Sequence, residues 1–135
     1  MMSLFISFLL FFSMAGWAEP PHKEKRAQLG REFTLRVGEQ VAIKEAGLTI
    51  SFSAVAEDSR CPKGVDCIWA GNGRVVMKVS KGHGTAATVE LNTGVAPKEQ
   101  RFQDYEIKLV GLNPYPQKGV NLKRGDYTAT FIVSK

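Results

Sequence analysis

The chain has 135 residues, the length of a single domain, and its 18 Lys and Arg against 13 Asp and Glu give a formal net charge of +5. Its 2 Cys exclude a zinc site of four cysteines and a scaffold held by several disulfides. The glycine loops that bind phosphates or dinucleotides do not occur, nor do the short motifs of zinc proteases and serine hydrolases. Basic and acidic residues are interspersed, which argues against a histone-like tail.

The uncharged segment 1–18 is typical of a signal peptide. Leu4–Phe12 is an unbroken apolar run except for one serine, and small residues at Gly16 and Ala18 favour cleavage after Ala18. The mature chain is then expected to begin at Glu19. No Lys or Arg precedes the apolar run, so an uncleaved anchor is the alternative, but the run is shorter than the roughly 20 residues of a membrane-spanning helix.

Export to the periplasm or the exterior has consequences for the rest of the chain. It places Cys61 and Cys67 in an oxidising compartment, where two cysteines normally form a disulfide. Residues 19–31 are mostly polar and contain adjacent prolines, so we expect a mobile tail there. The folded domain is expected to occupy residues 32–135.

From residue 32 onward, apolar and polar residues alternate with a period of two, which indicates half-buried β-strands. The alternation places Ala54, Ala56 and Met77 on inward faces. Asn72-Gly73 is a dipeptide favoured in hairpin turns. The expected strands lie around residues 33–37, 41–43, 48–56, 75–79, 87–91, 105–109 and 127–133, with a loop over 92–100.

About seven short strands with frequent turns predict an all-β fold. The size and spacing favour an antiparallel β-sandwich of immunoglobulin-like size, and a small closed β-barrel is the alternative. No stretch has a sustained helical period. The pattern does not determine which strands pair, nor does it indicate an oligomeric state.

Residues 57–73 contain most of the unusual chemistry of the chain. They include the segments Asp58-Ser59-Arg60-Cys61-Pro62 and Cys67-Ile68-Trp69-Ala70-Gly71. Here the chain resembles a family of small exported bacterial proteins that carry D-S-R-C-P followed by C-x-W-A-G, and to which no activity is assigned. The resemblance extends to Asp126-Tyr127-Thr128 in the last strand and spans residues 32–134. It implies export and a shared fold.

This loop is the candidate binding site of the sequence. A Cys61–Cys67 disulfide is expected to act as a structural staple, with presentation of a rigid loop to a partner as the alternative. Trp69 is expected to be mostly buried against the disulfide, with an exposed binding role as the alternative. Arg60 is expected to form an ion pair, with Asp58 or with Asp66, rather than to act in catalysis. The candidate binding residues are Asp58, Arg60, Lys63, Asp66 and Trp69.

The leading functional hypothesis is a non-enzymatic binding or structural domain of the bacterial envelope or exterior. Its partner would be a protein or an anionic envelope polymer, not nucleic acid, and the processed chain is not expected to insert stably into a membrane. We expect no cofactor, no metal and no catalytic residue. Oxygen ligands for calcium are available at Glu57, Asp58 and Asp66, but Arg60 and Lys63 would oppose a dication there.

Two other functions are compatible with the residues. The first is a serine protease inhibitor that presents Lys63 on the disulfide-closed loop 61–67. The second is a weak hydrolase that uses His83, which stands between two glycines in a predicted hairpin turn.

Overall fold

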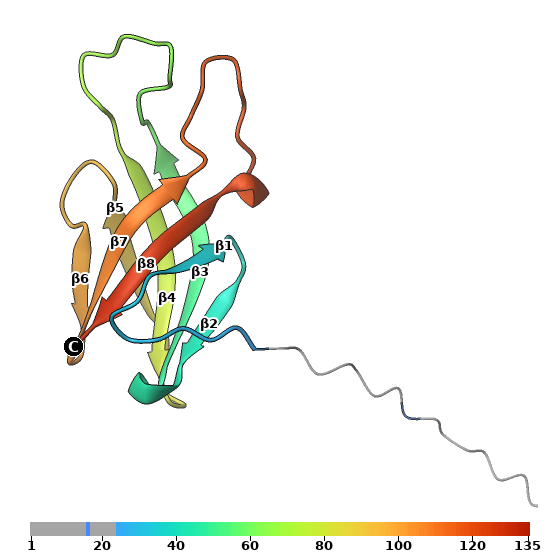
Figure 1. The fold of residues 1–135 in the computed structure, drawn as a ribbon, viewed down its shortest axis with the longest axis vertical. Helices are drawn as coiled ribbons and strands as arrows, with labels where there is room; N and C mark the ends of the chain where they lie inside the picture. The colour runs from blue at the N-terminus through green and yellow to red at the C-terminus, as the bar shows by residue number, and fades with distance from the viewer. Residues whose placement is uncertain (1–15, 17–23) are drawn as a thin grey trace, which may run out of the picture.

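The computed structural model describes residue 16 and residues 24–135, so the expected signal peptide and its cleavage site lie outside the described residues apart from Gly16. Within the described part of the chain, no helix is long and apolar enough to cross a membrane. Figure 1 shows an elongated body of β-strands with long loops at one end. Its elements are β1 (Phe33–Arg36), β2 (Gln40–Ile43), η1 (Lys44–Ala46), β3 (Leu48–Asp58), β4 (Gly73–Lys81), β5 (Ala87–Asn92), β6 (Glu99–Phe102), β7 (Tyr105–Asn113), η2 (Arg124–Asp126) and β8 (Thr128–Ser134).

The strands form two four-stranded antiparallel sheets, which confirms the predicted β-sandwich. One sheet has the order β1-β8-β7-β6 and the other has the order β2-β3-β4-β5. The chain therefore begins in the first sheet, completes the second, and returns to the first. Because the sheets are separate, the alternative of a closed barrel is wrong.

The inward side chains of both sheets form one hydrophobic core. In β8, Ala129, Phe131 and Val133 are fully buried, and the residues between them are half-buried. The ring of Phe52 from β3 meets the ring of Phe131 edge to face, with centroids 6.2 Å apart, and so joins the two sheets. Met77 is buried in this core, as its place in the alternation predicts.

The structure corrects the expected strands at two places. The loop expected over residues 92–100 contains the start of β6, an edge strand without alternating apolar residues, so the sequence carries no signal for it. In β3 the register shifts after Phe52, and Ala54 is half-buried while Ala56 is exposed. A bulge rotates the strand relative to its neighbour, which ends the simple alternation.

The expectation of a mobile tail over residues 19–31 does not hold for its described part. The backbone N–H of Ala42 in β2 donates to Lys25, and that of Ala27 donates back to Ala42, at 2.9 and 3.0 Å. Gly30 donates to Val133 of β8. These bonds extend the folded body to about residue 25. Both sheets and the core residues named above lie within residues 24–135, so this segment contains what it needs to fold on its own.

Candidate functional site at the loop end

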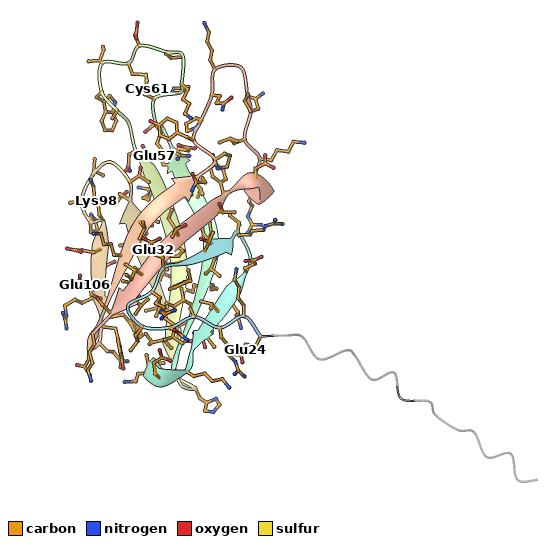
Figure 2. All side chains as sticks on the ribbon, in the orientation of Figure 1. Glu24, Glu32, Glu57, Cys61, Lys98 and Glu106 are labelled. Carbon is orange, nitrogen blue, oxygen red and sulfur yellow. A yellow bond between two sulfur atoms is a disulfide. The ribbon has the colours of Figure 1, made fainter. Side chains whose placement is uncertain are left out.

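The loops between β3 and β4 (residues 59–72), β5 and β6 (93–98), and β7 and β8 (114–127) lie at the same end of the sandwich, and we call this region the loop end (Figure 1). The loop between β3 and β4 contains the expected disulfide between Cys61 and Cys67, whose Cα atoms are 5.9 Å apart. In Figure 2, Cys61 lies beyond Glu57, toward the tip of this loop. Because the disulfide closes a ring within the loop, it links no strand to another.

Arg60 fixes the base of the disulfide loop. Its Nε and Nη2 donate to the two carboxylate oxygens of Asp58 at 2.7 and 2.9 Å, which confirms the predicted ion pair. The same guanidinium donates from Nη1 to the carbonyl of Leu112 at 2.6 Å and from Nη2 to that of Pro114 at 3.0 Å. Arg60 is only 6% exposed. It therefore joins the disulfide loop to the end of β7, a role that the spacing of Asp58 and Arg60 does not reveal.

Asp58 also accepts a hydrogen bond from the hydroxyl of Tyr127, at 2.8 Å. Burial, the largest single influence, raises the pKa of the Asp58 carboxyl, but the hydrogen bonds from Arg60 and Tyr127 and the charge of Arg60 outweigh it and lower the pKa. Burial and the bond to Asp58 raise the pKa of Tyr127 to about 12. The three side chains form one hydrogen-bonded network.

Two of the loops are also joined through their main chains. The backbone N–H of Lys63 donates to Pro116 at 2.9 Å, and the N–H of Lys118 donates to the carbonyl of Lys63 at 3.2 Å. The guanidinium of Arg60 lies 5.2 Å from the centre of the Tyr115 ring, a cation–π arrangement. The disulfide loop and the β7–β8 loop therefore support each other.

The third loop is attached through two buried asparagines, Asn72 and Asn92, whose contact the sequence did not predict. The side-chain Nδ2 of Asn72 donates to Oδ1 of Asn92 at 2.9 Å, and Oδ1 of Asn72 accepts from the N–H of Gly94 at 3.0 Å. Asn72-Gly73 is thus not a hairpin turn, because Asn72 lies inside the protein and Gly73 begins β4. A local pattern of two residues could not predict a bond to a residue twenty positions away.

Trp69 is 58% exposed, so the prediction that it packs against the disulfide is wrong. The disulfide lies in a projecting loop, where no second layer covers the indole. The neighbouring Ile68 is fully exposed, at 107%. Seven large apolar side chains of the described residues are exposed, and only Val110 on β7 lies outside the loop end. The other six are Val65, Ile68, Trp69, Val95, Tyr115 and Val120.

The remaining candidate residues are not gathered into a reactive site. Lys63 and Asp66 are exposed in the disulfide loop. His83 is exposed in the turn between β4 and β5, at the opposite end of the sandwich (Figure 1). Among the residues that the structure covers, no three His, Cys, Asp or Glu side chains form a group suited to a metal ion.

A groove of about 760 Å³ runs from the loop end along β7. It is lined by Gly71 of the disulfide loop, Gly94 of the β5–β6 loop, Gly111 and Leu112 of β7, and Tyr115 of the β7–β8 loop. It therefore gives the loop end a recess beside its projecting tips.

Comparison of the chain with models of protein families, with curated proteins and with solved structures finds no match. The resemblance noted in residues 58–62 and 67–71 thus remains a prediction. Function has to be inferred from the loop end itself, where three loops are joined by hydrogen bonds and present six exposed apolar side chains.

Proposed function

We propose that this protein is a non-enzymatic binding module whose loop end contacts its partner. The observation that carries the proposal is the gathering of six of seven exposed large apolar side chains at one end of the sandwich. Scattered apolar residues are normal on a protein surface, but an apolar cluster marks a site of interaction. Trp69 and Tyr115 belong to the residue types that contribute most to binding surfaces.

The bonds within the loop end support the same function. A flexible loop loses conformational entropy when it binds, and a preorganised loop avoids much of that cost. Here the disulfide, the Arg60 contacts and the pairing of Lys63 with residues 116–118 constrain the two longest loops before any partner arrives. The structural and the binding interpretation of the disulfide are therefore compatible.

We further propose that the protein acts outside the cytoplasm, in the bacterial envelope or the exterior. The Cys61–Cys67 disulfide supports this location, since such bonds persist in oxidising compartments. The apolar run in residues 4–12 supports it at the level of sequence.

The alternative of protease inhibition has less support. An inhibitor loop pairs its main chain with the protease in the manner of an added strand. In this protein the N–H and the carbonyl of Lys63 are already paired with Pro116 and Lys118. The hydrolase alternative is likewise weak, because His83 lies exposed in a turn far from the groove.

Affinity capture from an envelope fraction of the source organism tests the binding function. The bait is the segment 24–135, compared with the double variant Ile68→Ser/Trp69→Ser and with Val76→Ser. Val76 is a half-buried aliphatic residue on β4, away from the loop end, and serves as the matched control. Material that binds the unchanged segment and the Val76 variant, but not the double variant, is expected. Equal capture by all three baits, or by none, would contradict the proposal.

A further inference from the structure

Building on the proposed binding function, we infer that the loop end docks on the surface of an anionic phospholipid bilayer. Its disulfide loop and β7–β8 loop would enter the headgroup region. Three features of these two loops carry the inference: their exposed apolar residues, their charge, and their projecting shape.

The exposed residues of the two tips are of the types that partition into a membrane interface. Trp and Tyr prefer the boundary between headgroups and acyl chains because each has an apolar ring and a polar group. Ile68, fully exposed beside Trp69, has no contact that it would lose on leaving water. Val65 and Val120 add aliphatic surface to the same tips.

The two loops are also basic. The segments 61–69 and 114–123 contain three lysines and one aspartate, a net charge of 3 − 1 = +2, with Lys123 at the base of its loop, where η2 begins. Each basic residue close to an anionic membrane strengthens binding by about fivefold. Lysine can also keep its ammonium among the headgroups while its aliphatic stem lies along the apolar layer. The basic residues are Lys63, Lys118 and Lys123.

The shape of the loop end favours a lipid layer over a protein. The two loops, paired through Lys63 and residues 116–118, project together beyond the ends of the strands (Figure 1). A fluid headgroup layer can close around such a projection, whereas a protein partner would need a matching pocket. The aliphatic residues also argue against a sugar polymer, which would use the aromatic faces but leave Ile68 and Val65 exposed.

The backbone limits how deeply the tips can enter. A peptide group without a partner is costly in the hydrocarbon core. Lys63 has its main-chain groups paired with the neighbouring loop, but the ring closed by the disulfide is too short and irregular to pair all of its own. We therefore expect shallow, reversible adsorption rather than insertion, consistent with a folded body that stays in water.

Vesicle binding tests the inference directly. The segment 24–135 has Trp69 as its only tryptophan, since the other, Trp17, precedes it. Vesicles of phosphatidylglycerol and phosphatidylcholine should shift the Trp69 emission to the blue and sediment with the protein, and vesicles of phosphatidylcholine alone should bind much more weakly. Ile68→Ser should lower the partition coefficient by about tenfold, while Val76→Ser should leave it unchanged.

Charge reversal distinguishes docking at the loop end from general attraction of a basic protein. Lys63→Glu/Lys118→Glu should lower partition into anionic vesicles far more than Lys44→Glu/Lys135→Glu, which makes the same charge change elsewhere in the fold. Circular dichroism checks that each variant remains folded, as expected for exposed positions.

Two results would overturn the inference. One is the absence of binding to anionic vesicles, and the other is an equal loss of binding in both charge-reversed pairs. The unchanged segment could fail to bind vesicles and still capture an envelope component through Ile68 and Trp69. In that case the bilayer inference is wrong and the proposed binding function stands. If the capture also fails, both are wrong.

Discussion

At the scale of single residues, Arg60 joins two separate segments of the loop end through its hydrogen bonds. It is a buried cation whose guanidinium contacts one carboxylate and two carbonyls from two different segments. A buried ion pair adds little over an apolar pair, but removal of one partner leaves the other charge uncompensated. Removal of Arg60 is therefore expected to cost more free energy of unfolding than the intact ion pair contributes.

Arg60→Ala should lower the free energy of unfolding by about 3 kcal/mol or more at neutral pH, because it leaves the carboxylate of Asp58 without its cation and the carbonyls of Leu112 and Pro114 without this donor. Lys63→Ala, which removes an exposed side chain three residues away, should change it by less than about 0.5 kcal/mol. Denaturant unfolding of both variants measures the difference. Similar small losses in both would show that the Arg60 contacts do not stabilise the fold.

The pH dependence of stability reports the same network. The pKa of Tyr127 is raised to about 12 in the fold against about 10 in the unfolded chain, so its contribution is complete below pH 10 and is lost as the pH rises toward 12. Tyr127→Phe should be less stable than the unchanged protein at neutral pH, and this difference should shrink between pH 10 and 12. A difference that stays constant over this range, in unfolding curves at several pH values, would argue against the bond to Asp58.

Asp58 acts in the opposite direction. Its pKa is lowered in the fold, so its contribution is present above the unfolded value of about 3.9 and is lost as the pH falls through the folded value. The cost of Arg60→Ala should therefore decrease in acid, where Asp58 is protonated. The same unfolding curves measure this decrease.

At the scale of elements, the loop between β3 and β4 depends on close contact between backbones. Gly71 has a φ of +75°, and a Cβ atom there would overlap the carbonyl of Ser59. Gly64, in the same loop, has a φ of +83° but open space around it. The two glycines thus separate the cost of a left-handed backbone from the cost of steric overlap.

Gly71→Ala should destabilise the protein by about 3 kcal/mol or more, since backbone strain and steric overlap add. Gly64→Ala should cost about 1–2 kcal/mol, from the backbone conformation alone. Thermal and denaturant unfolding of the two variants give the comparison. If Gly71→Ala were the milder change, the packing of this loop against Ser59 would be wrong.

At the scale of the whole molecule, the contacts that stabilise the fold and the proposed binding surface lie in different parts. The core between the two sheets holds the fold together, with the pair Phe52 and Phe131 joining the layers. The loop end projects beyond that core, and its exposed apolar residues contribute little to the fold. Because the loop end projects beyond the core, its apolar side chains stay exposed and available for the proposed binding.

Phe131→Ala should cost about 3–5 kcal/mol of unfolding free energy, the range for removal of a buried aromatic ring. Trp69→Ala should cost less than about 1 kcal/mol, because most of the indole is already in water. The emission of Trp69 in segment 24–135 should be red-shifted and readily quenched by acrylamide. A large loss of stability in Trp69→Ala, with blue-shifted emission, would restore the interpretation of a buried tryptophan.

The sequence by itself determined the all-β class, most strands and the inward residues of β8, since alternation along a strand is a local property. It also determined the disulfide, whose cysteines lie six positions apart, and an ion pair of Arg60, but left Asp58 and Asp66 open as the partner of Arg60. The edge strand β6, the Asn72–Asn92 bond and the exposure of Trp69 were decided only by the tertiary structure. Each depends on which distant segments come to lie beside it, and no local pattern of residues encodes that.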